Sequence, residues 1–354
     1  MLYCQIEQAP RLSDYVESLR ERENALQTLR IHFSHFKFNI DSTVSIDSDE
    51  INGIYTLNAQ AEKYLCQLFN MPWTLILNAE DELKSLIFNF KFKNRLDKDA
   101  MFTVTLQEDE IYRISASTLL SIPSDELLYC VSNCKPTHLK QDDLRIIEFQ
   151  NNGVLDISII SPDLTSQPVK GDVVAYGVNV RRNYNNAVQI QGAAFRLICS
   201  NGAINRVCTH NKPHLKRPGL DSLNRSLFVE NIERAAKDAW DSCKAHSEGL
   251  QTLVKTKVSA AGLVGIAKRL TSKPFFLSQK HARFVTDYVR GHHNPSEISL
   301  YDLYNAMTYI GTHSMSLPYG TRTRLRLGAG EISRRNSKVC DACRQVVFED
   351  VKPH

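Results

Sequence analysis

The spacing of hydrophobic residues changes along the chain, from a mixed pattern to alternation and then to helical spacing. In the first 140 residues, apolar positions at helical spacing predict helices over 11–31, 58–70, 81–92 and 124–131. Alternating apolar and polar residues predict strands over 32–38, 101–107 and 111–117. The N-terminal region is therefore expected to mix helices with strands.

Between residues 144 and 199 the pattern becomes that of strands. Apolar or alternating runs cover 144–149, 155–160, 173–180 and 187–199, and Asn-rich turns separate them. This succession predicts an antiparallel meander. From residue 227 onward, helical spacing predicts helices over 227–258, 260–271, 277–290 and 298–310.

These patterns predict an α+β protein with a central antiparallel sheet, a mixed N-terminal region and a helical, basic C-terminal region. We expect consecutive regions at 1–140, 141–222 and 223–354. The apolar runs are shorter than the roughly 20 residues that cross a bilayer. The chain starts without the basic and apolar segments of a signal peptide. The sequence therefore predicts a cytoplasmic protein with no membrane partner.

The formal net charge of +4 conceals an uneven distribution. Residues 1–170 contain 16 Lys and Arg against 25 Asp and Glu, which is a net charge of −9. Residues 171–354 contain 27 against 14, which is +13. The basic half favours a polyanionic partner such as nucleic acid. The alternative is that the two halves attract each other or a neighbouring subunit.

The turn between the strands at 173–180 and 187–199 carries Arg181, Arg182 and Tyr184. Guanidinium groups match phosphate oxygens, and a tyrosine ring offers a stacking face to an unpaired base. We therefore predict that this hairpin tip binds nucleic acid. The competing interpretation is a solvated turn whose Asn residues adopt positive φ.

A second basic cluster contains Arg322, Arg324 and Arg326 at a period of two. In a strand, these side chains would share one face about 7 Å apart, a spacing comparable to that of phosphates. The alternative is a charged outer face of a sheet. Five further basic residues extend the predicted nucleic-acid surface: Lys212, Lys216, Arg217, Lys268 and Arg269.

Cys208, His210 and His214 form a compact group of metal-ligating residue types. Zinc requires four such ligands in tetrahedral geometry, and the CxxC at 340–343 could supply a half-site. The nine cysteines are otherwise scattered, as in a chain with reduced thiols. The interpretations are therefore a zinc site at this group or thiols and loop histidines without metal, and no other cofactor is expected.

Catalytic signatures are missing from the sequence. It contains no Walker A motif, no GxGxxG after a strand, no GxSxG and no HExxH. The acidic residues Asp47, Asp49 and Glu50 resemble a divalent-ion site, although surface loops have similar composition. We therefore favour a binding protein over an enzyme.

Three segments carry a family resemblance. The strand pair GDVVAYGVNV at 171–180 and QIQGAAFRLICSNG at 189–202 is similar to the core motif of the phage/plasmid-like proteins with domain of unknown function 932. LYNAMTYIGTH at 303–313 resembles their helix motif, and YRISAS at 112–117 resembles their N-terminal strand. Tyr309 stands where that family often has glutamate. The resemblance implies a phage, prophage or plasmid setting without an assigned reaction.

The sequence thus predicts a homo-oligomeric nucleic-acid-binding protein of a mobile genetic element. Single-stranded DNA binding or annealing in recombination or replication is the function we expect. Two alternatives remain open. One is a metal-dependent nuclease that uses Cys208, His210 and His214, and the other is an inhibitor or adaptor that binds a host protein.

Overall fold

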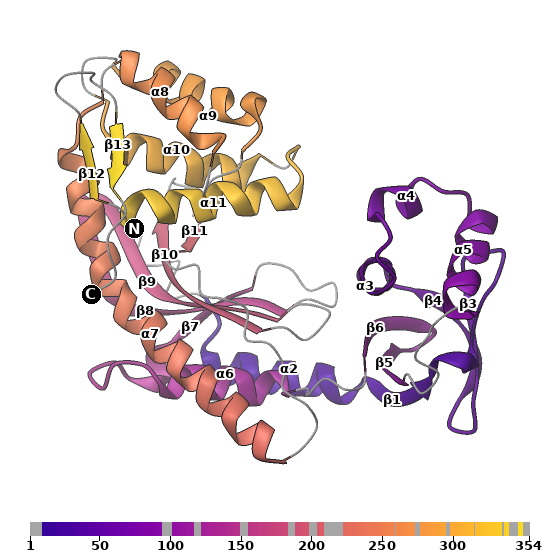
Figure 1. Ribbon diagram of the computed structural model, residues 1–354. Helices are drawn as coiled ribbons and strands as arrows, with labels where there is room; N and C mark the ends of the chain where they lie inside the picture. Colours follow the sequence, from indigo (N-terminus) through magenta and orange to yellow (C-terminus); the bar gives the residue numbers. More distant parts are fainter. Residues whose placement is uncertain are drawn as a thin grey trace.

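The computed structural model describes residues 9–93, 101–116, 122–148, 155–182, 188–197, 204–208, 222–258, 260–272, 277–294, 298–314, 316–334, 336–339 and 346–349. Two large hydrophobic cores organise these residues, and a small third cluster of Ile160, Ala175, Ala193 and Phe195 lies on the main-domain sheet. One core lies wholly between Ile31 and Ile114, and the other draws residues from both sides of that interval. The first segment is therefore a domain inserted into the second, and we call the two parts the inserted domain and the main domain (Figure 1).

A six-stranded sheet forms the inserted domain, in the order β1-β5-β6-β4-β3-β2. Its strands are β1 (Gln27–His32), β2 (Phe36–Phe38), β3 (Val44–Asp47), β4 (Asn52–Leu57), β5 (Met101–Gln107) and β6 (Glu110–Ala116). Only β4 and β6 pair in parallel among the strand pairs described. Three helices join the sheet in this domain: α3 (Ala59–Leu68), α4 (Trp73–Leu77) and α5 (Asp81–Lys93).

The main-domain sheet is an antiparallel meander, as the alternation over 144–199 predicts. Its strands lie in the order β11-β10-β9-β8-β7. They are β7 (Arg145–Glu148), β8 (Leu155–Val169), β9 (Asp172–Arg182), β10 (Val188–Leu197) and β11 (Ile204–Cys208). Strand β9 is buried over nearly its whole length, and the long helix α7 (Ser222–Lys255) packs across the sheet (Figure 1).

Six further helices complete the main domain: α2 (Leu12–Asn24), α6 (Ser124–Asn133), α8 (Ala260–Leu270), α9 (Gln279–His292), α10 (Leu300–His313) and α11 (Tyr319–Arg334). A small hairpin of β12 (Asn336–Val339) and β13 (Val346–Glu349) follows them. None of the helices in the described ranges has both the length and the apolar composition that a bilayer span requires. The α+β class is confirmed, with helices on the central sheet.

The cores divide the chain differently from the consecutive regions expected at 1–140, 141–222 and 223–354. Leu12, Leu19 and Leu128 from the first region pack in the same core as Trp240 and Leu303. Helix α2 contacts helix α6, although the whole inserted domain lies between them in the sequence. The N-terminal helix therefore belongs to the main domain, because its apolar face is buried there.

Two local predictions near the N-terminus are also corrected. The helix expected over 11–31 ends at Asn24, and after a two-residue turn the chain continues as strand β1 from Gln27. The strand expected over 32–38 is interrupted by a 3₁₀ turn at Phe33–His35 before β2. Over a few residues, the apolar positions in both stretches fit a helical period as well as strand alternation. The pairing with other elements therefore decides which conformation forms.

Candidate functional site

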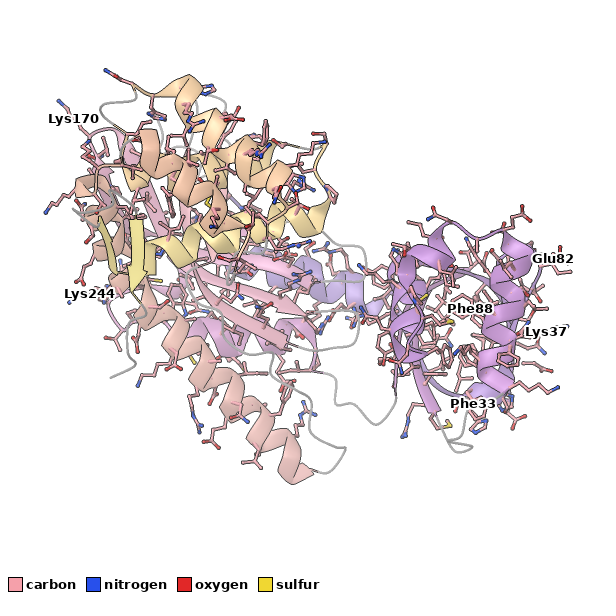
Figure 2. All side chains as sticks on the ribbon, turned by 45° about the horizontal axis from the view of Figure 1, so that its top comes forward. Phe33, Lys37, Glu82, Phe88, Lys170 and Lys244 are labelled. Atoms are coloured by element: carbon pink, nitrogen blue, oxygen red, sulfur yellow. The ribbon has the colours of Figure 1, made fainter. Side chains whose placement is uncertain are left out.

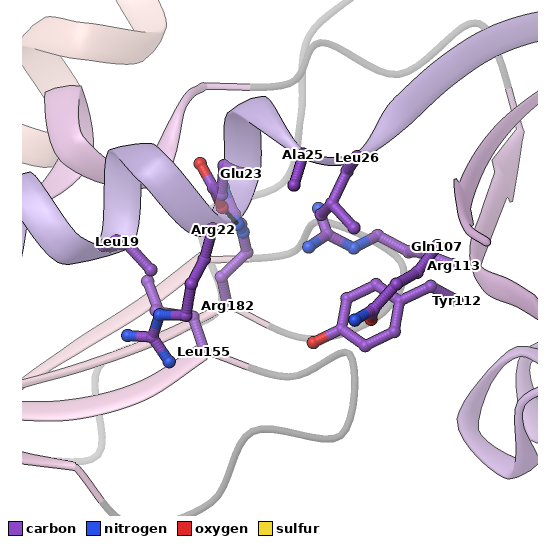
Figure 3. Close-up of a pocket in the computed structure, with 10 residues that line it drawn as sticks. All are labelled: Leu19, Arg22, Glu23, Ala25, Leu26, Gln107, Tyr112, Arg113, Leu155 and Arg182. Carbon is purple, nitrogen blue, oxygen red and sulfur yellow. Dashed lines mark hydrogen bonds and ion pairs between the residues drawn. The ribbon is translucent and has the colours of Figure 1, made fainter.

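Two adjoining pockets lie where the inserted domain meets the main domain. Their volumes are about 310 and 220 Å³, and both are lined by Glu23, Leu26, Arg113 and Arg182. Figure 3 shows the larger pocket, with Arg22, Glu23 and Leu26 approaching from α2 and the segment after it. Arg113 and Tyr112 approach from strand β6. We call the two pockets together the interdomain cleft.

One wall of the cleft is a polar face of the inserted-domain sheet. On β5, Phe102 and Val104 are buried in the core, whereas the alternate residues Thr103 and Thr105 line the smaller pocket. The same wall includes Thr28 of β1, and its hydroxyl lies 3.3 Å from that of Thr105. Successive side chains of a strand point to opposite faces, so the buried core forces these hydroxyls toward the cleft.

The opposite wall centres on Arg182 at the end of β9. Its guanidinium donates to the Ile122 carbonyl at 2.6 Å, to Glu23 Oε1 at 3.0 Å and to the Ser124 hydroxyl. Glu23 also accepts from the Ser124 backbone N–H at 3.1 Å, at the first turn of α6. A carboxylate at a helix N-terminus is electrostatically favourable, so Glu23 is stabilised from two directions.

The pKa of Glu23 reflects these contacts. Burial alone would raise the pKa of this carboxyl, but the charge of Arg182 and the hydrogen bonds from Ser124 outweigh burial and hold it below its ordinary value. Glu23 is therefore a firmly ionised partner for Arg182.

Arg113 is a second buried cation in the cleft. Its Nε atom is buried without a hydrogen-bond partner among the residues that the structure describes. Burial first, and then the charge of Arg182, lower the pKa of Arg113 to about 10, although Glu23 acts in the opposite direction. Two guanidinium groups close together raise the local positive potential.

The charges lining the larger pocket are those of Arg22, Arg113, Arg182 and Glu23. Arg22 is exposed and lies over the Tyr15 ring, 5.4 Å from its centroid. Three cations thus meet one carboxylate in this lining. Tyr112, which is half-buried, adds an aromatic ring to the same pocket (Figure 3).

The structure changes the interpretation of the β9–β10 hairpin. Its antiparallel pairing is confirmed, with Arg182 opposite Val188. Arg182, however, is only 3% exposed and paired with Glu23, so it does not project from a solvated tip. Arg181 is half-buried and in register with Asp156. Tyr184 lies outside the described residues.

The arginines at 322, 324 and 326 lie in helix α11, so the shared face that a strand would give them does not form. On a helix, residues two apart diverge by about 200°, which separates Arg324 from the other two. Arg324 is exposed, whereas Arg326 is 6% exposed and donates to the Arg322 carbonyl at 3.4 Å. Leu325, Ala329 and Ile332 are buried at helical spacing, and their burial decides the conformation.

The remaining predicted basic residues fall in two groups. Lys268 is exposed on α8, and Arg269 lies on the same helix. Lys212, Lys216 and Arg217 lie outside the described residues, as do His210 and His214. The backbone of Cys208 ends strand β11.

A metal site finds no support in the part of the chain that the structure describes. No group of three or more His, Cys, Asp or Glu residues gathers there in an arrangement suited to a metal ion. The acidic cluster of Asp47, Asp49 and Glu50 does not form such a group. The CxxC segment at 340–343 lies outside the described ranges, so the zinc hypothesis stays a prediction.

Sequence reasoning missed the residues that line the cleft, apart from Arg182. Arg113 directly precedes the core residue Ile114 and pairs with Thr105, so it lies on the face opposite the core. A register shift in the β5–β6 pairing brings Ile111, two residues earlier, to the core face, so the alternation around Ile114 is the sequence signal for Arg113. That signal is weak, because most charged residues on strands face solvent. Its proximity to Arg182 follows only from packing between the two domains.

Comparisons with known proteins supply no relative. No protein family model matches this chain, and neither a curated protein nor a solved structure matches it significantly. The resemblance to the phage/plasmid-like family therefore stays a prediction from sequence motifs. The cleft has to be interpreted from its own chemistry.

Proposed function

We propose that this protein binds nucleic acid, and that the interdomain cleft receives the phosphates of a single strand. The observation that carries the proposal is the position of Arg113, a guanidinium with a buried, unpartnered Nε beside Arg182. An incoming phosphate would accept hydrogen bonds from this group and offset its unfavourable proximity to the second cation.

The polar face of the inserted-domain sheet favours a ligand that has several acceptor oxygens, such as phosphate. Thr28, Thr103, Thr105 and Ser115 line the smaller pocket together with Arg113. Hydroxyls and guanidinium groups are the donors that commonly contact phosphate oxygens in nucleic-acid complexes. A carboxylate ligand would use fewer of these donors.

Two features favour a strand over a small anion. The two pockets share four lining residues, so they are neighbouring recesses with space for more than one phosphate group. The larger one also contains the ring of Tyr112. A positive groove with an aromatic side chain is the combination that binds unpaired strands, since the ring stacks on any base.

The cleft supports strand binding and no particular reaction. The setting in phage or plasmid recombination or replication comes from the motif resemblance at 171–202 and 303–313. In that setting, the protein would hold single-stranded DNA for annealing or exchange.

Fluorescence anisotropy with a labelled single-stranded oligonucleotide, at several salt concentrations, tests the proposal. Arg113→Gln should weaken binding and reduce the log–log salt slope by about 0.7, because one phosphate contact is lost. The matched control is Arg234→Gln, which removes the same charge from an exposed ion pair with Glu230 on α7. It should change neither quantity appreciably.

The proposal fails if wild-type protein does not bind the oligonucleotide, or if Arg113→Gln and Arg234→Gln behave alike. Binding of inorganic phosphate, but not of oligonucleotide, would identify the cleft as a small-anion site instead. Equal affinity for single strands and duplex would overturn the preference for single strands.

A further inference from the structure

Helix α5 of the inserted domain has apolar residues on two opposite faces. On the inner face, Phe88 and Phe92 are buried in the core. On the outer face, Leu83, Leu86 and Phe90 are 47%, 68% and 64% exposed. Residues at i, i+3 and i+7 share one side of a helix, so these three side chains form a continuous apolar stripe. We call it the α5 stripe.

Helix α5 lies on the side of the inserted domain that faces away from the main domain (Figure 1). In Figure 2, Phe88 points into the inserted domain, and Glu82 of the same helix lies at its outer rim. The cleft lies on the opposite side, where the two domains meet. A partner bound on the stripe would therefore leave the cleft open.

Charged residues flank the stripe in an ordered way. Glu80 and Glu82 lie at the N-terminal end of the helix, and Lys91 and Lys93 lie at its C-terminal end. The members of the pairs Glu82/Lys93 and Glu80/Lys91 are each about three helical turns apart, so each pair lies along one flank. Both flanks thus begin with a glutamate and end with a lysine, and Lys84, on the Glu80/Lys91 flank, forms an ion pair with Asp81.

The charges that flank the α5 stripe are self-complementary in an antiparallel pair of helices. If two copies pack stripe against stripe about a two-fold axis perpendicular to the helix, the helices run antiparallel and like flanks meet. Glu82 of one copy then approaches Lys93 of the other, and Glu80 approaches Lys91. Leu83 and Phe90 would face each other around the same centre, midway along the stripe.

We propose that this protein forms a homodimer through the α5 stripe. A contiguous, exposed apolar stripe is unusual on a monomer and commonly marks an interaction surface. The acidic end disfavours an anionic membrane surface or a nucleic acid as the occupant, whereas a second copy satisfies both the apolar and the charged residues. Two clefts in one particle would also increase the avidity for a long strand.

Sedimentation velocity over a range of protein concentrations tests the dimer. Leu86→Asp should raise the dimer dissociation constant by at least about tenfold, because it places a charge at the centre of the contact. Since Leu86 is 68% exposed, the fold should be unaffected, which circular dichroism checks. Phe284→Asp, on the exposed side of α9 in the main domain, is the control and should leave the dimer unchanged.

A charge swap separates the two-fold arrangement from nonspecific apolar association. Glu82→Lys alone should weaken the dimer by a few-fold, because it brings lysines together on one flank. Adding Lys93→Glu should restore the affinity. A wild-type protein that is monomeric at all concentrations, or a dimer that persists in folded Leu86→Asp, would overturn the proposal. Failure of the swap to restore affinity would overturn the antiparallel arrangement.

Oligonucleotide binding is not needed for these measurements. The outcome for the dimer is therefore independent of the function proposed for the cleft.

Discussion

Arg182 Nη2 lies 3.0 Å from Glu23 Oε1, and this ion pair fixes both connections between the two domains. Glu23 lies in the last turn of α2, directly before the chain enters the inserted domain. Ile122 and Ser124, which also accept hydrogen bonds from Arg182, lie where the chain returns to the main domain. Arg182 thus holds the two crossing segments together at one point.

Removing this guanidinium should destabilise the protein strongly. Arg182→Ala leaves Glu23 and the Ile122 carbonyl without their buried donor, and breaking a buried pair typically costs about 3–5 kcal/mol. Urea denaturation measures the change in the free energy of unfolding. Arg234→Ala removes an arginine from an exposed pair and should change it by less than about 1 kcal/mol. Similar losses in the two variants would mean that the buried contacts of Arg182 contribute little to stability.

Glu23 should make stability depend on pH in the acidic range. Its pKa in the folded protein lies below the value of a free glutamate. The stabilisation is therefore fully present above the pKa of the unfolded chain and is lost as the pH falls through the lower, folded pKa. The free energy of unfolding should decrease below about pH 4.5 in the wild type. Glu23→Gln should be less stable at neutral pH and should lose less on acidification, and parallel pH profiles would contradict this assignment.

Arg113→Met should separate stability from binding. Burial and Arg182 disfavour the charged form of Arg113 more than Glu23 favours it. Methionine keeps much of the side-chain volume without the charge, and we expect a gain of about 1 kcal/mol in the free energy of unfolding. Oligonucleotide affinity should fall in the same variant. Thermal unfolding and anisotropy measure the two effects, and a loss of stability would show that the cation is satisfied without a ligand.

Gly177 should tolerate no side chain. A Cβ at this position would lie 2.0 Å from the Ile159 carbonyl oxygen and 2.7 Å from Ile160 Cα on the neighbouring strand. Backbone atoms in the centre of a sheet cannot move aside cheaply, so Gly177→Ala should cost about 3 kcal/mol or more. Gly291→Ala is the matched control, because a Cβ there meets nothing within 4 Å. It should be neutral or slightly stabilising, and equal effects in a denaturation experiment would refute the close approach.

Much of the secondary structure is already present in the sequence as local periodicity. The strands β9 and β10 and the helices α7 to α10 follow the predicted ranges within about five residues, and β8 begins at the predicted residue but extends nine residues further. Hydrophobic spacing carries this information because each element must bury one face, whichever partner covers it. The apolar–polar alternation of β5 likewise determines that Thr103 and Thr105 share a face opposite to Val104.

Tertiary structure alone decides which elements share a core and which charges meet. The return of the chain to α6 beside α2 makes residues 27–116 an insertion, and no local pattern encodes that closure. Arg182, which the sequence places in a hairpin tip, is buried by tertiary packing. The segment around Arg324 is a helix because its apolar residues are buried at helical spacing. The free energy of a buried guanidinium depends on the charges and the solvent around it. In this protein those neighbours come from distant parts of the sequence, so local patterns do not reveal them. The sequence therefore determines which residues can carry charge, and only the fold determines that Arg113 and Arg182 do so side by side.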